Sequence, residues 1–223
     1  MKTLTNIDKT AYLFLIVIFG MGIYYANTDL QYFDKVYTVE DGFVENGSAI
    51  FLLSSSVILL YRFFNLFKYK DLFWKLGILA MAIVFFFGAG EEISWGQRIF
   101  NIESSQYFIE NNAQGETNLH NMVVGGTKIN KLIFSQLLTG VLVIYLIITP
   151  FLYRKFEWVK NLANKFAVPI VQWHHTLAFL AGTTLLVFIS SDRKWEVYEF
   201  AFSVIFLLIF INPFNKEIYA SNS

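Results

Sequence analysis

The sequence predicts an all-α protein, a polytopic integral membrane helix bundle with about six transmembrane helices and both termini cytoplasmic. Hydrophobic residues make up 56% of the 223 residues and charged residues only 15%, whereas a soluble domain carries about 25% charged residues. Apolar runs long enough to cross a bilayer recur along the whole chain. They leave no room for a soluble domain, so we expect residues 1–223 to form a single membrane domain.

Six apolar segments approach the roughly 20 residues that a membrane-crossing helix needs. They cover residues 10–27, 46–66, 73–94, 131–152, 167–190 and 195–212. The first segment follows two lysines, as in a secretory signal. No small-residue cleavage site follows it, so we expect an uncleaved membrane helix.

Charged residues orient the predicted helices. The connecting segments on the side of the N-terminus carry 11 of the 17 basic residues. Because basic residues in short loops stay cytoplasmic, both termini should be cytoplasmic. The other side carries 13 of the 17 acidic residues, which predicts an acidic face that attracts cations. We expect a multipass protein of the cell (inner) membrane with this face outward, the lipid bilayer as a partner, and no nucleic-acid partner.

The longest segment between predicted helices, residues 96–130, is too polar to cross a membrane. Apolar side chains such as Phe100 and Ile109 alternate there with charged and amide residues. This pattern is typical of a segment that lies along the membrane interface. The predicted orientation places the segment on the outer face.

Two adjacent carboxylates, Glu91 and Glu92, directly follow the third apolar run. A carboxylate at the edge of a membrane is costly unless it is paired, protonated or bound to a metal, so both are functional candidates. If the helix continued, Glu91 would share one face with Trp95 and Arg98, and the latter two would contact a substrate. The alternative is that the helix ends near Gly90 and both glutamates are hydrated among the headgroups.

A second group of candidates comprises Glu116 and His120. If this segment were helical, the four-residue spacing would place the two side chains together, as in a shared metal site or a base with its orienting partner. The predicted catalytic residues are therefore Glu91, Glu92, Glu116 and His120. If the cofactor is a divalent metal ion, the predicted ligands are Glu91, Glu116 and His120. The alternative is a turn-rich interfacial loop with one incidental histidine.

Two acidic pairs are secondary candidates. Asp41 and Glu45 lie one turn apart where the second predicted helix begins, and Glu196 and Glu199 share a face where the sixth begins. The helix dipole alone favours acidic residues in a first turn, so a structural role is the simpler interpretation.

His174 and His175 are also secondary candidates, because adjacent histidines are a common metal-ligand type. The predicted orientation places them near the cytoplasmic end of the fifth helix, away from the outer carboxylates. A core histidine bonded to a neighbouring helix is the simpler interpretation.

Two strings carry a resemblance: GEEISWGQRIF at residues 90–100 and QGETNLHN at residues 114–121. They resemble strings in an uncharacterised group of small bacterial multipass membrane proteins. This resemblance implies a membrane location and does not assign an activity. Glu91 and Glu92 followed by an arginine more distantly resemble the CAAX-type intramembrane proteases, whose paired glutamates supply the base that activates water. Arg98 follows Glu92 by six residues here, a longer spacing than in that family.

Three functions are compatible with these patterns. The leading one is a membrane-embedded hydrolase or related enzyme whose outward-facing carboxylate and histidine site acts on a lipid or peptide, with Arg98 binding an anionic group. The second is a cation- or proton-coupled carrier or channel. The third is a non-catalytic membrane scaffold or accessory subunit with a membrane protein partner. The sequence leaves open whether the protein is an enzyme.

Overall fold

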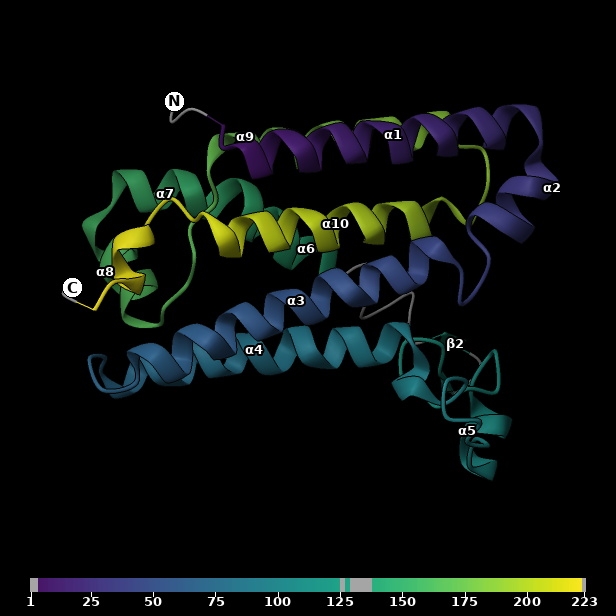
Figure 1. Cartoon of the computed structure of the whole chain (residues 1–223), viewed down its shortest axis with the longest axis horizontal. Coiled ribbons are helices and arrows are strands. Elements are labelled where there is room, and N and C mark those ends of the chain that lie inside the picture. The colour runs from purple at the N-terminus through teal and green to yellow at the C-terminus, as the bar shows by residue number, and fades with distance from the viewer. Residues whose placement is uncertain (1–3, 125–126, 129–137, 222–223) are drawn as a thin grey trace.

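A computed structural model describes residues 4–124, 127–128 and 138–221. The described chain is mainly helical, as predicted, and its four longest helices are α1 (Asn6–Thr28), α3 (Phe43–Leu66), α4 (Leu72–Glu92) and α10 (Lys194–Ile211). These helices pack side by side, with α10 between α1 and α3, and with α4 against α3 (Figure 1). The start of α1 and the end of α10 lie at the same end of the bundle.

Shorter elements connect the long helices. Between α1 and α3 lie α2 (Leu30–Tyr32) and the π-helix η1 (Phe33–Tyr37). The chain after α4 forms the 3-10 turn η2 (Ser94–Gly96), α5 (Gln106–Asn111) and an antiparallel pair of two-residue strands, β1 (Val123–Val124) and β2 (Thr127–Lys128). It continues through α6 (Leu138–Val143), η4 (Ile144–Ile148), α7 (Thr149–Lys155) and α8 (Glu157–Lys165). The last elements around α10 are α9 (Trp173–Leu185), η5 (Leu186–Phe188) and η6 (Lys216–Tyr219).

The outer surface of the long helices is apolar. Within the described residues, α1, α3 and α4 are long and apolar enough to cross a membrane, and residues 139–165 add a fourth crossing if two segments bent by 119° count as one. Only 22–28% of the most apolar stretch of each of the three helices is buried inside the molecule. Large side chains such as Ile16, Phe64 and Val84 are 64–70% exposed. An apolar surface this extensive suits contact with lipid, as expected of a membrane protein.

The structure adjusts two of the predicted spans. The predicted spans 10–27, 46–66, 73–94 and 195–212 coincide with α1, α3, α4 and α10 to within a few residues. The predicted span 167–190 becomes helical only at Trp173, because the backbone before it pairs elsewhere: Ile170 N donates to Asn215 Oδ1 (2.8 Å) and Phe214 N donates to Ile170 O (2.7 Å). The predicted span 131–152 is described from residue 138 onward, and its helix runs on to Lys155. Residues 131–137 lie outside the described residues.

The core is centred on α10. Nine of its residues are buried, among them Phe200, Ile205 and Ile209. Phe200 packs against Phe14 of α1 and Phe51 of α3, with ring centroids 5.6 and 5.5 Å apart. The start of α10 is thereby held beside the start of α3 and the end of α4, where most of the predicted site residues lie (Figure 1).

Candidate functional site

Five carboxylates from three helices are grouped at this end of the bundle, four of them within charge-interaction range of Glu92. We call them the acidic cluster; its members are Glu45 of α3, Glu91 and Glu92 of α4, and Glu196 and Glu199 of α10. The Glu92 carboxylate is close enough to the other four to feel their charges. The sequence alone allowed the helix dipole to explain the acidic pairs at the starts of α3 and α10. In the structure, Glu45, Glu196 and Glu199 of these pairs lie near Glu92. Glu45 also accepts a hydrogen bond from the backbone amide of Asp41.

Glu91 is the most firmly held member of the acidic cluster. Its side chain is buried, and Oε1 accepts a hydrogen bond from Trp95 Nε1 at 2.8 Å. Oε2 accepts from two backbone amides, Leu119 N at 2.6 Å and His120 N at 3.1 Å. Three donors from two segments therefore fix both oxygens of an ionised carboxylate. Burial of an ionised carboxylate without such donors would cost far more than burial of a neutral polar group, for which the cost is on the order of 2–7 kcal/mol.

The helix does not continue beyond Glu92, so the predicted shared face of Glu91, Trp95 and Arg98 is wrong. Ser94, Trp95 and Gly96 have φ values of 46°, 56° and 74°. A left-handed conformation at Ser94 and Trp95 costs on the order of 1–3 kcal/mol each and persists only where neighbours enforce it. The turn folds the Trp95 indole back over Gly90, where a Cβ would lie 2.9 Å from two ring carbons. Trp95 still reaches Glu91, whereas Arg98 is carried away from it.

Arg98 and Glu116 form a second polar group beside the acidic cluster. Arg98 Nη2 donates to Glu116 Oε2 at 3.0 Å, and Nη1 pairs with Asp41 Oδ2 at 2.5 Å. Glu116 Oε2 also accepts from Ser94 Oγ at 2.6 Å. Asn118 Nδ2 in turn donates to Ser94 Oγ at 2.9 Å. The guanidinium is thus neutralised by two carboxylates, and this group locks the left-handed turn onto the 112–121 loop.

His120 lies beside Glu91 and is close enough to Glu196 and Glu199 to feel their charges. The segment from Glu116 to His120 is not helical, so the two side chains do not pair as its spacing predicted; His120 Nδ1 instead lies 3.8 Å from Glu91 Oε2. Burial lowers the pKa of His120, but the carboxylates of Glu91, Glu199 and Glu196 raise it by more, so the pKa lies above its ordinary value. The side chain is 27% exposed. The imidazole is therefore both held by a carboxylate and open to solvent on one side.

The tautomer of His120 follows from its second neighbour. Asn121 Nδ2 lies 3.0 Å from His120 Nε2. An amide nitrogen only donates, so Nε2 acts as acceptor and the neutral ring carries its proton on Nδ1, towards Glu91. Nε2 of the neutral ring carries the basic lone pair, so a proton-transfer reaction would use this atom.

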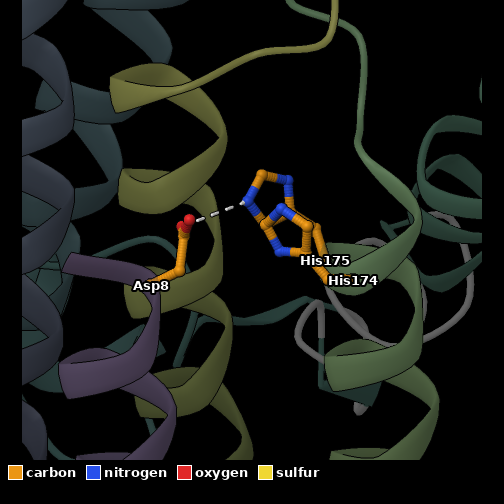
Figure 2. A group of neighbouring side chains, drawn as sticks. All are labelled: Asp8, His174 and His175. Atoms are coloured by element: carbon orange, nitrogen blue, oxygen red, sulfur yellow. Dashed lines mark ion pairs between the residues drawn. The ribbon is translucent and has the colours of Figure 1, made fainter. Parts of the chain in front are cut away.

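The histidine pair lies at the opposite end of the bundle. His174 and His175 begin α9 and face Asp8 in the first turn of α1 (Figure 2). Sequence reasoning did not single out Asp8. The sequence could have indicated that Asp8 lies near the histidine pair, because the starts of the first and fifth predicted spans were expected on the same side of the membrane.

Metal-ligand geometry also differs between the two ends. Among the described residues, one group of three or more ligating side chains has all its ligand atoms within 4.8 Å of one another, and it comprises Asp8, His174 and His175. The predicted ligands Glu91, Glu116 and His120 are not such a group in the described chain, because Glu116 turns towards Arg98 and Ser94. The acidic end thus offers proton-transfer groups, and the other end offers metal ligands.

The chain was compared with protein-family models, with curated proteins and with solved structures, and none of them matches it. The resemblances carried by residues 90–100 and 114–121 stay predictions. Functional conclusions about this chain therefore depend on the geometry of its own side chains.

Proposed function

We propose that the protein is a membrane-embedded hydrolase or related enzyme in which His120 is the general acid and base and Glu91 is its positioning residue. The observation that carries the proposal is the Glu91–His120 pair, in which a carboxylate fixed by three donors faces Nδ1 of a partly exposed imidazole. A base oriented in this way by a third group is the arrangement that activates a nucleophile in many hydrolases. Ser94, the nearest hydroxyl of the turn, is buried, so water is the nucleophile in this proposal.

The reaction needs two proton transfers at one atom. When a water or substrate displaces the Asn121 amide, His120 Nε2 takes a proton from the water as its oxygen attacks the carbonyl carbon of an ester or amide. The protonated imidazole is stabilised by Glu91 and by the nearby Glu196 and Glu199. The same proton then passes to the departing oxygen or nitrogen, which completes hydrolysis.

Charge limits the substrates that fit. Because Glu91, Glu196 and Glu199 are close enough to His120 to raise its pKa, a neutral or cationic group next to the scissile bond is favoured over an anionic one. Arg98 was predicted to bind an anionic group, but Asp41 and Glu116 already neutralise it. In this proposal Arg98 is a positioning residue that holds the 112–121 loop against the turn after α4.

The proposal includes an orientation. In this proposal the chain crosses the membrane six times, through α1, α3, α4, α6 with α7, α9 and α10. Both termini are then cytoplasmic, and the acidic cluster lies at the outer face of the inner membrane. Figure 1 supports this arrangement, because the start of α1 and the end of α10 lie at the end of the bundle opposite the start of α3 and the end of α4, which carry Glu45, Glu91 and Glu92. The site would then meet lipids or peptides at the outer interface.

The test is a product assay on the full-length protein in lipid nanodiscs. The protein is incubated with a lipid extract of the producing cells and, separately, with a peptide library, and products are identified by mass spectrometry. H120Q should lower turnover by about 100- to 10,000-fold, since general acid–base catalysis contributes that much. K68Q, at an exposed lysine far from the site, should keep wild-type turnover. Equal product from wild type and a folded H120Q would overturn the proposal.

A second candidate is a carrier of cations or protons. It is favoured by the mutual proximity of Glu45, Glu92, Glu196 and Glu199, since carboxylates at a membrane end are ligands for a cation or a proton. Proteoliposome flux separates the two: a gradient-driven flux that persists in H120Q and disappears in E92Q supports the carrier and contradicts the enzyme.

A further inference from the structure

The end of the bundle opposite the acidic cluster contains a convergent set of metal ligands. Figure 2 shows Asp8 on α1 pointing across to the two imidazole rings at the start of α9. His175 Nε2 lies 4.0 Å from Asp8 Oδ1, and the ring centroids of His174 and His175 are 4.1 Å apart. The two helices come together here although their ligands are separated by more than 160 positions of the sequence.

Among the described residues, His175 Nε2 has no hydrogen-bond partner. It is inaccessible to solvent, and the whole residue is 0% exposed. A buried polar atom left unsatisfied is unfavourable, and such atoms are rare in folded proteins. This nitrogen points towards a carboxylate that is itself only 1% exposed. A cation between the two would satisfy both groups.

The carboxylate is already oriented for this role. Asp8 Oδ2 accepts hydrogen bonds from Thr5 N at 2.8 Å and Thr5 Oγ1 at 2.7 Å. These bonds occupy one oxygen and leave Oδ1 turned towards His175. Metal-ligating side chains are commonly oriented by such outer hydrogen bonds. Tyr12 Oη plays a similar part for His174, lying 2.7 Å from Nδ1 of that ring.

We propose that Asp8, His174 and His175 form a binding site for a divalent transition-metal ion of the Zn²⁺ class. Two imidazoles and one carboxylate match the ligands that such ions prefer, whereas Mg²⁺ and Ca²⁺ prefer oxygen alone. Three protein ligands leave a fourth position for water or substrate, and the half-buried His174 marks the side from which an ion enters. The ion also links α1 to α9.

Binding requires a small closure of the three side chains. Their ligand atoms lie within 4.8 Å of one another, whereas tetrahedral ligands at zinc distances are about 3.3–3.6 Å apart. Side-chain rotations that bring the ligand atoms closer together by roughly 1 Å close this gap. Ligation through Nε2 places the ring proton of His175 on Nδ1, so its contact with the backbone amide of Gln172, long at 3.4 Å, is given up.

The test is Zn²⁺ titration of the full-length protein in detergent, purified with a tag that contains no histidine and stripped of metal. Wild type should bind one Zn²⁺ per chain. H175Q and D8N should bind more than about 100-fold more weakly, because loss of a ligand exceeds the 10- to 100-fold effect of losing an outer hydrogen bond. T5V, which removes the Thr5 hydroxyl that donates to the Asp8 carboxylate and accepts from the Asp8 backbone amide, should weaken binding by about 10-fold.

The third histidine provides the matched control. H120Q removes an imidazole at the other end of the bundle and should leave the Zn²⁺ affinity unchanged. Circular dichroism and size-exclusion chromatography establish that each variant is folded, and D8N keeps the shape of its side chain should H175Q unfold. The proposal is overturned if wild type binds no Zn²⁺ at micromolar concentration, if folded D8N and H175Q bind as tightly as wild type, or if H120Q abolishes binding.

Discussion

His120 Nδ1 lies 3.8 Å from Glu91 Oε2, although 28 residues separate the two in the sequence between the end of α4 and the following loop. The distance is that of an ion pair, longer than a hydrogen bond. Glu91 is held in place by donors that belong to Trp95 and to the backbone of the same loop that carries His120. The carboxylate therefore anchors the loop and, together with Glu199 and Glu196, raises the pKa of the imidazole.

The pair predicts a pH-dependent stability. The pKa of His120 lies above its ordinary value of 6.5 in the folded chain, so folding favours the protonated ring. The contribution is fully present below pH 6.5 and is lost as the pH rises through the raised pKa. Thermal unfolding in detergent at a series of pH values should show wild type losing stability relative to H120Q over this window. A constant difference between the two at all pH values would contradict the prediction.

Trp95→Phe should destabilise the turn after α4. The substitution keeps an aromatic ring over Gly90 but removes the hydrogen bond from Nε1 to the Glu91 carboxylate. A hydrogen bond to a charged group contributes about 1.5–3 kcal/mol, and the partial exposure of Trp95 places the expected loss at the lower end. The matched control is Trp158→Phe, since Trp158 is 66% exposed. Equal unfolding temperatures for the two variants would show that the bond to Glu91 contributes nothing.

Two glycines in the last turns of α4 should respond differently to alanine. A Cβ on Gly90 would lie 2.9 Å from ring carbons of Trp95, whereas a Cβ on Gly88 would lie 3.6 Å from Leu52 Cδ1, an ordinary contact. Gly90→Ala should therefore cost about 1–3 kcal/mol through overpacking. Gly88→Ala should be neutral or stabilise by up to about 1 kcal/mol, because alanine favours the helix. Chemical denaturation in micelles measures both, and equal effects would argue against the folded-back indole.

The orientation can be tested with single cysteines, because the natural chain has none. Glu103 lies in the segment after α4 and Lys68 in the turn between α3 and α4, and both are exposed. In intact cells, a membrane-impermeant maleimide should label E103C and spare K68C until the membrane is opened. Labelling of K68C alone would place the acidic cluster on the cytoplasmic side.

The long helices could be predicted from the sequence because their signals are local. An apolar run such as residues 46–66 carries its own length and composition, and α3 coincides with it to within a few residues. The start of α9 could not be predicted in this way. The residues before Trp173 are as apolar as those of a membrane-spanning helix. Their backbone is not helical, because the amide of Ile170 donates to the side chain of Asn215.

The site residues also divide into those with a local sequence signal and those that depend on contacts between distant parts of the chain. The charge pattern predicted that Glu91, Glu92 and His120 lie on one side of the membrane, and the structure brings them to one end of the bundle; their roles stay proposals. The turn at Ser94 and Trp95 could not be predicted, because neither residue type favours a left-handed backbone. Contacts with residues distant in the sequence, such as the bond from Ser94 to Glu116, hold the turn in place.

The most direct test of the Glu91–His120 pair is an NMR titration of His120 in protein with labelled histidine. Only three histidines are present, and the signal missing from H120Q identifies His120. Wild type should titrate with a pKa above 6.5, and the pKa should fall in E91Q, since the carboxylate that favours the protonated ring is gone. A pKa at or below 6.5 in wild type, or the same pKa in both proteins, would contradict the pairing on which the proposed function depends.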